Sequence, residues 1–449
     1  MRSEKRKRYL IQFLAIFLAV LAPIGYLRVL GATDDLLQVD FDAAFSGEHI
    51  ITDRDGTILY EGECLYPELL GNLFGTEGLI ANSLYNCYVD EMQVAGFNPL
   101  EGRSSLKGTT MKITLMSLAD QQEIQKLYGD HDGCCFAYNY ETGEVYIALS
   151  LPSGLGAGVR EGSMHNGCLN GTYTPASTLK ILTTICALAQ NAGLKDFTYT
   201  CQKQYMLPDG NVINCHNYHG TIGLADAIGL SCNCYFTALV RQLNVKDVSK
   251  TLAELGILNE GTDAVADDAR GVMDRLSYIT GKTKVTNFGQ FQSVWGMVGQ
   301  GNTVANPVYM AMTAGAVANG GTVAQPYIME EILSCGTDPV YQAGQAEEEK
   351  GLLKLIAPDT AQLVQSIWSQ AVEEHYHTDD KPLSEDITLA KTGTAEEDHG
   401  DNDRLLLGVM EDYNTAFFIM VKDSEDQNGL IYDVANQLAE SVKKIAMAG

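Results

Sequence analysis

The chain has 449 residues, of which 45% are apolar and 19% charged, so it can bury a large core and is not intrinsically disordered. Lys and Arg number 30 against 57 Asp and Glu, which gives a formal net charge of −27. This acidity argues against a nucleic-acid partner, because neutralising phosphates requires clustered Lys and Arg.

Residues 1–31 differ in composition from the rest of the chain. An uncharged stretch over residues 9–27 follows a group of basic side chains, namely Arg2, Lys5, Arg6, Lys7 and Arg8. A helix of that length spans roughly 28 Å, close to the thickness of the bilayer core. The pattern predicts a single-pass anchor in the cell membrane, with the N-terminus cytoplasmic and everything after Arg28 outside. A cleaved signal peptide is the alternative, although its apolar core should be shorter, about 7–15 residues.

Residues 32–124 are expected to form a short extracellular module. Within it, residues 51–59 predict two strands joined by a turn at Asp55-Gly56. No residue pattern with recognisable chemistry occurs in this module.

Residues 125–449 are predicted to form one domain, with strands near both ends and helices between them. The strands are expected at residues 136–140, 145–149, 387–390, 405–409 and 416–421. The best marked helix covers residues 307–319, because Asn306 is a good N-cap, Pro307 suits the first helical position, and Gly320-Gly321 ends it. A C-terminal helix is expected at residues 433–446.

The first chemical motif is Ser177-x-x-Lys180. The apolar run that follows, residues 179–189, predicts a helix that is buried almost all round. Ser177 would lie in its first turn with Lys180 on the same face, where burial would lower the lysine pKa from its usual value near 10.4 and make it a base. The two other Ser-x-x-Lys segments begin at Ser104, in a loop, and at Ser441, in the C-terminal helix, and neither offers such burial.

Two further motifs follow in the chain. Ser231-Cys232-Asn233 is the only Ser-x-Asn of the sequence and lies between two short predicted helices, and Lys391-Thr392-Gly393 is the only Lys-Ser/Thr-Gly and ends a predicted strand. From composition, the three motifs in this order are expected by chance roughly 0.03 times.

Ser177-x-x-Lys180, Ser231-x-Asn233 and Lys391-Thr392-Gly393, in this order, resemble the signature set of penicillin-binding proteins and serine β-lactamases. The segments 299–301, 306–311 and 391–396 resemble the transpeptidase branch. A looser likeness to the class B branch, which is monofunctional and membrane-anchored, runs through Asp53-Arg54-x-Gly56. The resemblance implies an α+β fold, with a five-stranded antiparallel sheet flanked by helices and an all-helical subdomain.

The resemblance also implies a role for each residue of the first two motifs. Ser177 would attack the carbonyl of the penultimate D-Ala of a peptidoglycan stem peptide, and Lys180 would take its proton. Ser231 would relay a proton to the leaving nitrogen, and Asn233 would hold the backbone of the donor peptide.

The third motif would bind the substrate. Lys391 and Thr392 would hold its terminal carboxylate, or that of a β-lactam, and Gly393 would let the strand approach closely. The backbone N–H groups of Ser177 and Thr394 would form the oxyanion hole. This scheme needs neither a metal nor a cofactor.

The implied partners are peptidoglycan stem peptides, lipid-linked nascent glycan and β-lactam antibiotics. Too few residues precede Ser177 for a glycosyltransferase domain, so a separate membrane glycan polymerase is expected. Two alternatives stay open, a hydrolase with the same motifs (a D-Ala-D-Ala carboxypeptidase or a serine β-lactamase) and a non-catalytic β-lactam sensor or scaffold.

The chain contains 11 cysteines. Cys201 and Cys215 flank a hairpin-like segment and could form a disulfide across it, or both could remain free thiols. Cys215-His216-x-x-His219, with Cys201 upstream, contains the ligand types that bind zinc, but the long separation of the two cysteines favours the disulfide or the thiols. Cys232 is interpreted as a small buried filler rather than a redox switch.

Overall fold

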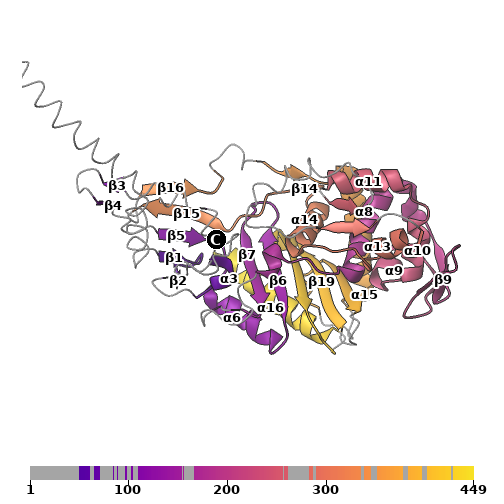
Figure 1. Cartoon of the computed structure of the whole chain (residues 1–449), viewed down its shortest axis with the longest axis horizontal. Coiled ribbons are helices and arrows are strands. Elements are labelled where there is room, and N and C mark those ends of the chain that lie inside the picture. The colour runs from indigo at the N-terminus through magenta and orange to yellow at the C-terminus, as the bar shows by residue number, and fades with distance from the viewer. Residues whose placement is uncertain are drawn as a thin grey trace, which may run out of the picture.

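Figure 1 shows the computed structural model of the chain. The structure describes residues 50–60, 65–70, 110–153, 166–255, 257–260, 283–286, 290–334, 338–344, 351–377, 383–396, 402–425 and 428–448, with residues 84, 88, 97–98, 103–104 and 155 between them. No helix in these ranges is long and apolar enough to cross a bilayer. The predicted anchor at residues 9–27 lies outside the described residues.

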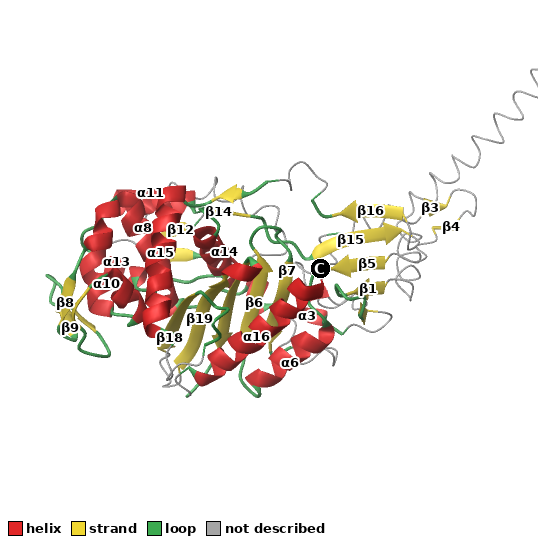
Figure 2. Cartoon of the chain, turned by 180° about the vertical axis from the view of Figure 1, so that it is seen from behind, coloured by secondary structure: helices red, strands yellow, loops and turns green. Residues whose placement is uncertain are grey.

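A five-stranded sheet forms the centre of the larger domain. Its order is β18 (Leu389–Glu396), β19 (Asn402–Met410), β20 (Thr415–Val421), β6 (Gly133–Asn139) and β7 (Val145–Leu151), and every neighbouring pair is antiparallel. All seven residues of β20 are buried, because α14 (Pro307–Ala318) covers one face of the sheet, and α16 (Gly429–Ala448), with α6 (Leu118–Tyr128) beside it, covers the other (Figure 2). A strand covered on both faces needs a continuous apolar run rather than alternation. The predicted α+β fold is therefore confirmed.

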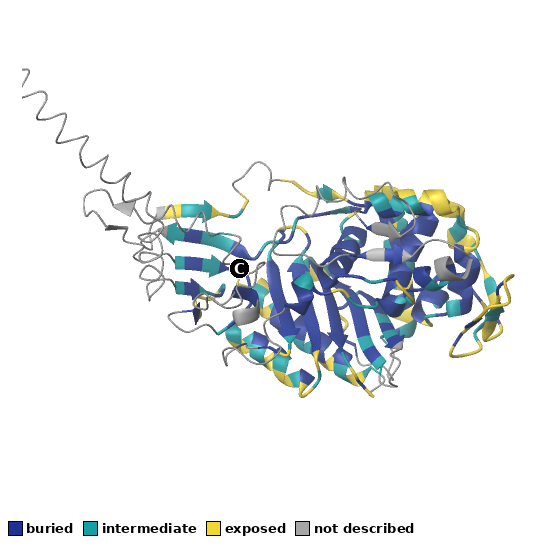
Figure 3. Ribbon diagram, viewed as in Figure 1, coloured by how far each residue is buried: buried dark blue, intermediate teal, exposed yellow. Residues whose placement is uncertain are grey.

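Helices gather beyond the β18 edge of the sheet, where Figure 1 shows them as a group of their own. They are η1 (Ala176–Leu179), α8 (Lys180–Gln190), η2 (Ala192–Asp196), α9 (Leu224–Gly229), α10 (Asn233–Val240), α11 (Val245–Glu254), α13 (Gln290–Met297) and α15 (Pro358–His375). Helix α8 is buried almost throughout, and α11 and α15 pack against it. Figure 3 shows this buried interior continuing into the sheet.

Two short strand pairs project from the helical part. β8 (Tyr199–Cys201) pairs with β11 (Gly220–Ile222), and β9 (Gln204–Met206) pairs with β10 (Val212–Asn214). These four strands and their connections, residues 199–222, are called the hairpin lobe below. The other described elements are α3 (Pro67–Leu70), β3 (Phe97–Asn98), β4 (Arg103–Ser104), α7 (Gly167–Asn170), β12 (Leu258–Glu260), β13 (Lys284–Thr286), β14 (Thr322–Val323), β17 (Leu353–Lys354) and η3 (Glu411–Tyr413).

A second five-stranded sheet combines the N-terminal module with a later segment. Its order is β16 (Asp338–Gln342), β15 (Met329–Ser334), β5 (Thr110–Ile113), β1 (Ile50–Thr52) and β2 (Ile58–Tyr60). The predicted hairpin at residues 51–59 is confirmed by the β1–β2 pair. Two strands of this sheet, β15 and β16, come from inside residues 125–449. The division of the chain at residue 124 stays a prediction.

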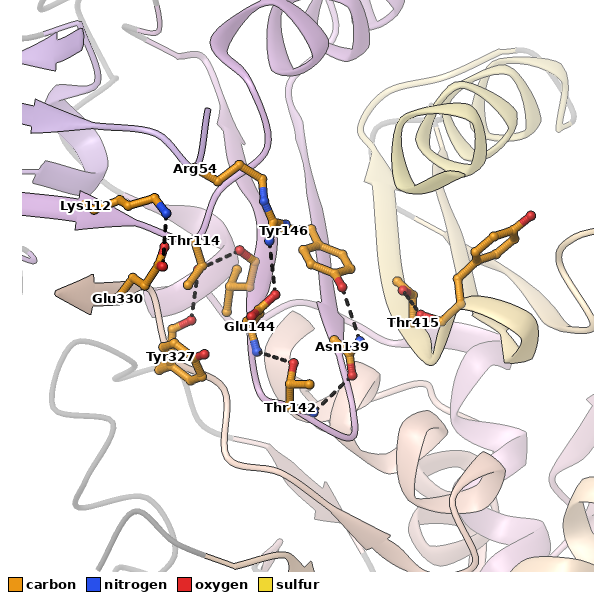
Figure 4. Close-up of polar contacts among 12 residues, drawn as sticks. Arg54, Lys112, Thr114, Asn139, Thr142, Glu144, Tyr146, Tyr327, Glu330 and Thr415 are labelled. Carbon is orange, nitrogen blue, oxygen red and sulfur yellow. Dashed lines mark hydrogen bonds and ion pairs between the residues drawn. The ribbon is translucent and has the colours of Figure 1, made fainter. Parts of the chain in front are cut away.

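Polar contacts join the second sheet to the larger domain (Figure 4). Arg54 Nη2 lies 3.1 Å from Glu144 Oε2, and Thr114 Oγ1 donates a hydrogen bond of 2.8 Å to the backbone oxygen of Val145. Asp53 has no exposed surface, and its carboxylate accepts hydrogen bonds from the backbone N–H groups of Asp55, Thr57 and Leu118. The Asp53-Arg54-x-Gly56 segment thus connects the β1–β2 turn to α6 and β7.

Several predicted boundaries were wrong, and three of them lie at the motifs. The strand predicted at residues 387–390 runs as β18 to Glu396, because Lys391-Thr392-Gly393 continues the ladder with β19 instead of ending it. Ser177 lies in the 3₁₀ turn η1, one turn before the α-helix that begins at Lys180. Asn233 is the first residue of α10.

Candidate active site

The Ser177 turn lies where η1 packs against β18. Ala176, which precedes Ser177, has φ +48°, a conformation that is unfavourable for a residue with a Cβ atom. Gly299 backs this turn so closely that a Cβ atom there would lie 1.8 Å from the backbone oxygen of Ala176. The turn leaves Ser177 partly exposed while Lys180, at the start of α8, has no exposed surface.

Lys180 Nζ is the centre of a hydrogen-bond network. It lies 2.9 Å from Ser177 Oγ, 3.2 Å from Ser231 Oγ, 2.7 Å from the backbone oxygen of Ser231 and 2.7 Å from Asn233 Oδ1. The last two oxygens can only accept, and a neutral amine has two N–H bonds to give them. The nitrogen lone pair is then left for a hydroxyl proton, which is the geometry of a base acting on Ser177.

Burial favours the neutral form of the Lys180 amine. Desolvation lowers the pKa of Lys180 to about 8, and the neighbouring thiols of Cys215, Cys232 and Cys234 act in the opposite direction. The ring of Phe236, centred 5.6 Å from Nζ, forms an apolar wall of this pocket. The predicted depression of the Lys180 pKa therefore comes from burial.

The second motif is held by a strained turn and a cap. Ser231 has φ +55°, and Cys232 caps α10, with its Sγ accepting a hydrogen bond from the N–H of Tyr235. Asn233 Nδ2 donates a hydrogen bond of 3.0 Å to the backbone oxygen of Asn214 in the hairpin lobe. This contact turns Asn233 Oδ1 towards Lys180.

Lys391 completes the network from the sheet. Its side chain has no exposed surface, and its Nζ donates hydrogen bonds to Ser231 Oγ at 3.1 Å and to the backbone oxygen of Thr392 at 2.7 Å. Ser231 Oγ thus lies between two amines, Lys180 and Lys391. The structure brings Ser177, Lys180, Ser231, Asn233 and Lys391 together, as the sequence predicted.

The remaining predicted residues line β18 beside them. A Cβ atom on Gly393 would lie 3.1 Å from Thr178 Cγ2 and 3.2 Å from the backbone oxygen of Pro175. Gly393 therefore lets β18 approach the Ser177 turn closely. Thr394 Oγ1 accepts a hydrogen bond of 2.9 Å from Arg404 Nη1. β18 is an edge strand, and an edge strand presents backbone N–H and C=O groups away from its neighbour.

Sequence reasoning missed the residues that hold β18 in place. Trp368 Nε1 donates to the backbone oxygen of Ala390 at 2.8 Å, and the hydroxyl of Tyr376 contacts both the N–H and Oγ1 of Thr392 at 3.0 Å. Both side chains are fully buried, as is Val372 between them in the chain. The i, i+4 spacing of Trp368, Val372 and Tyr376 could have indicated that they share one buried helix face.

Gln300 lies in the 299–301 segment that the resemblance singled out, but its contact with β18 was not predicted. Its Nε2 donates to the backbone oxygen of Thr394 at 3.4 Å. Together with Gly299, it joins the 299–301 segment to both the nucleophile turn and the third motif.

The hairpin lobe differs from the sequence expectation. Cys201 pairs in register with Gly220 rather than facing Cys215 across a hairpin, and both are free thiols. The structure thus has thiols at these positions and not the disulfide.

Comparison with known proteins agrees with this geometry. The family model of the penicillin-binding protein transpeptidase domain matches residues 133–444. Among curated proteins, the peptidoglycan D,D-transpeptidase PbpA of Mycolicibacterium smegmatis is 25% identical over 286 residues, which is 58% of this chain and 52% of that protein. The peptidoglycan D,D-transpeptidase MrdA of Acinetobacter baumannii is 22% identical over 217 residues, which is 44% of this chain and 32% of that protein. The chain thus aligns with about half or less of these relatives.

Solved structures share the fold. Penicillin-binding protein A from M. tuberculosis, solved as an imipenem acyl-enzyme complex, superposes with a TM-score of 0.71 at 17% identity, covering 90% of this chain and 100% of that one. The D,D-transpeptidase domain of a peptidoglycan glycosyltransferase from Eggerthella lenta gives a TM-score of 0.69 at 18% identity, covering 89% and 99%. With a family model matched across the sheet, the helical part and all three motifs, the chain belongs to the penicillin-binding protein transpeptidase family.

Proposed function

We propose that this chain is a serine D,D-transpeptidase that crosslinks peptidoglycan stem peptides through an acyl-enzyme on Ser177. The observation that carries the proposal is the 2.9 Å contact between Lys180 Nζ and Ser177 Oγ within a network that includes Ser231, Asn233 and Lys391. A hydroxyl beside a buried amine of lowered pKa is the arrangement that nucleophilic acyl transfer requires.

The acylation step follows from this network. Ser177 Oγ attacks the carbonyl carbon of the penultimate D-Ala, and its proton passes to the lone pair of Lys180 Nζ. As the ester C–O bond forms, the peptide C–N bond breaks, and the proton reaches the leaving nitrogen through Ser231 Oγ, 3.2 Å from Lys180 Nζ. An amine of a neighbouring stem peptide then attacks the ester, gives up its proton by the same route, and restores the Ser177 hydroxyl as the new amide forms.

The third motif binds the substrate in this scheme. The ammonium of Lys391 and the hydroxyl of Thr392 hold the terminal carboxylate, and Asn233 orients the donor peptide. The donor lies along the free edge of β18, and the backbone N–H groups of Ser177 and Thr394 hold the oxyanion. Loss of one oxyanion donor typically costs about 2.7–4 kcal/mol of transition-state stabilisation.

The cellular setting is part of the proposal. Residues 1–31 form a cytoplasmic tail and membrane anchor, residues 32–124 a short outer module, and residues 125–449 the catalytic domain outside the membrane. The substrate is then lipid-linked nascent glycan, extended by a separate membrane polymerase. Two results would support this topology. The chain should leave the membrane fraction only when detergent is added, and protease added to intact protoplasts should digest its catalytic domain.

Labelling by a fluorescent penicillin tests the nucleophile. Wild type is expected to form a covalent adduct, and Ser177→Ala and Lys180→Ala are expected to form none. Ser441→Ala is the matched control, because Ser441 begins another Ser-x-x-Lys segment, in α16. Equal labelling of wild type and Ser177→Ala would contradict the proposal.

A crosslinking assay with lipid-linked precursor and a polymerase separates the related activities. Crosslinks made by wild type and not by Ser177→Ala support the transpeptidase. Release of D-Ala without crosslinks would indicate a carboxypeptidase, and loss of the penicillin adduct within seconds would indicate a β-lactamase. A stable adduct on a chain that neither crosslinks nor hydrolyses would indicate a sensor.

A further inference from the structure

A cluster of soft ligands lies where the hairpin lobe meets the start of α10, and the acyl-transfer scheme does not use it. The thiols of Cys201, Cys215 and Cys232 and a ring nitrogen of His219 all lie within 4.8 Å of one another. The three cysteines are buried, and His219 is half-buried. They come from four separate places in the chain, the end of β8, the residue after β10, the residue before β11, and the N-cap of α10.

Two separations within this cluster have the values of a tetrahedral metal site. With Zn–S near 2.3 Å and Zn–N near 2.0–2.1 Å, a tetrahedron places two sulfurs about 3.8 Å apart and a sulfur and a nitrogen about 3.5 Å apart. Cys215 Sγ lies 3.8 Å from Cys232 Sγ and 3.6 Å from His219 Nδ1. A disulfide needs two sulfurs at about 2.05 Å, so the Cys215–Cys232 pair is much too far apart for one.

Cys134, Cys135, Cys168 and Cys186 show how a cysteine packs as plain filler, whereas Cys234, in the first turn of α10, lies beside the cluster and contacts Cys201 and Cys215. Cys186 lies inside α8, and Cys134 and Cys135 lie in β6. The thiol of Cys168 donates to the backbone oxygen of Leu149 at 2.8 Å. These thiols pack in the core of the larger domain, whereas the three of the cluster converge on a histidine in a projecting lobe.

The lobe has only a small core of its own, and three of its strands pack against α10. Its strands are three residues long, and β9 has no fully buried residue (Figure 3). Besides Cys201 and Cys215, its buried apolar side chains are Leu207, Ile213 and Ile222. So small a core does not stabilise a segment of this size, and natural small folds are usually stapled by disulfides or a structural metal.

We infer that Cys201, Cys215, His219 and Cys232 bind one zinc ion in a closed Cys3His site. The three thiols bind as thiolates and release their protons to solvent, and the imidazole binds through its neutral nitrogen. With four protein ligands there is no open position for water or substrate, so the ion is structural and takes no part in the acyl-transfer step.

The site also positions the second motif of the active site. Cys232 stands between Ser231 and Asn233, and Cys215 follows Asn214, whose backbone oxygen accepts the hydrogen bond from Asn233 Nδ2. An ion held by Cys215 and Cys232 therefore holds together the two segments that turn Asn233 Oδ1 towards Lys180. This influence on acylation rests on the proposed function, whereas the metal site itself does not.

Metal content of the full-length chain, purified in detergent with a phosphine reductant and without chelators, tests the site. Elemental analysis is expected to find about one zinc per chain in wild type and almost none in Cys215→Ala. Cys186→Ala is the matched control for a buried cysteine outside the cluster and is expected to keep its zinc. Wild type without zinc, or Cys215→Ala with full zinc, would overturn the inference.

The exposed end of the cluster allows a test with little risk of misfolding. Loss of an outer-shell partner typically lowers metal affinity about 10–100-fold, and His219→Ala, which removes a direct ligand, is expected to lower the zinc affinity by more than that. His216→Ala, at an exposed position three residues away, is expected to leave the affinity unchanged. Equal affinities in the two variants would remove His219 from the site. Cobalt reconstitution of wild type should give the thiolate charge-transfer and tetrahedral ligand-field bands of a Cys3His site, and an octahedral spectrum would contradict it.

A thiol count in denaturant separates zinc from a disulfide. The thiols of Cys201, Cys215 and Cys232 are expected to react once the metal is chelated. A Cys201–Cys215 disulfide, mapped by peptide mass spectrometry in the chain purified without reductant, would overturn the zinc site. Removal of zinc is expected to lower the melting temperature and slow acylation by penicillin. Zinc bound at full stoichiometry without any effect of its removal on acylation would refute only the positioning role.

Discussion

Tyr376 holds Thr392 by two contacts from a single phenol oxygen. That oxygen accepts a hydrogen bond from the Thr392 N–H at 3.0 Å and shares another with Thr392 Oγ1 at 3.0 Å. Tyr376 is fully buried just beyond the end of α15, and Trp368 of the same helix donates to Ala390. The orientation of the hydroxyl assigned to carboxylate binding is thus set by a helix outside the three motifs.

Tyr376→Phe is expected to slow acylation by penicillin about 2–10-fold, the effect of losing a hydrogen bond worth roughly 0.5–1.5 kcal/mol. If Thr392 binds the carboxylate, the change should appear mainly as weaker initial binding and not in the maximal acylation rate. Stopped-flow measurement of acylation against β-lactam concentration separates the two. Tyr138→Phe is the control, because the buried Tyr138 hydroxyl has no hydrogen-bond partner among the described residues. Equal effects of the two substitutions would contradict the positioning role.

The acylation rate is expected to depend on pH through Lys180. Burial lowers its pKa to about 8, and only the neutral amine accepts the Ser177 proton. Below pH 8 the neutral fraction of Lys180 falls tenfold per pH unit. The logarithm of the acylation rate should therefore rise with pH with a slope of one from about pH 6 and level off above about pH 8. Lys180→Arg should be inactive throughout, since a guanidinium stays charged. A flat wild-type profile between about pH 6 and 9 would refute the role of Lys180 as the base.

Gly393→Ala is expected to slow acylation at least about tenfold, because the added Cβ atom would press on Thr178 and Pro175 and push β18 away from the nucleophile turn. Gly223→Ala is the matched control, since a Cβ atom there meets nothing within 4 Å. Labelling rates with a fluorescent penicillin compare the two variants. If Gly393→Ala is labelled as fast as Gly223→Ala, the Ser177 turn can accommodate the added Cβ atom and the prediction is wrong.

Asp53→Ala is expected to lower the free energy of unfolding by roughly 2–3 kcal/mol, because it leaves three backbone N–H groups without their carboxylate acceptor. Denaturant unfolding, followed by circular dichroism, measures the change. Asp55→Ala, on the exposed side of the same turn, should stay within about 0.5 kcal/mol of wild type. The acylation rate of folded Asp53→Ala should be unchanged, and a selective loss of acylation would show that the junction also influences the active site.

The local patterns of the chain were sufficient for the central elements. Asn306 and Pro307 mark the start of α14, and Asn306 Oδ1 accepts hydrogen bonds from the N–H groups of Val308 and Tyr309 as expected for a cap. The apolar run after Lys180 is buried as α8. These predictions succeeded because capping and apolar periodicity act within a few residues of the chain.

Contacts between distant segments were not predictable in this way. The strands β15 and β16 join the N-terminal sheet across about two hundred residues of sequence, and neither their alternation nor their turns indicate the partner. The burial of Tyr376 was hidden by the charged and polar residues around it, Glu373, Glu374, His375 and His377.

The sequence by itself determined which residues form the candidate site. Ser177, Lys180, Ser231, Asn233 and Lys391 are residue types in a spacing that few other functions require. Only the tertiary structure decided how these groups act on one another. The 2.9 Å contact of Lys180 with Ser177, the approach of Lys391 to Ser231, and the convergence of Cys201, Cys215, His219 and Cys232 all depend on the packing of separate elements. Such distances are set by long-range packing, and no local pattern of residues encodes them.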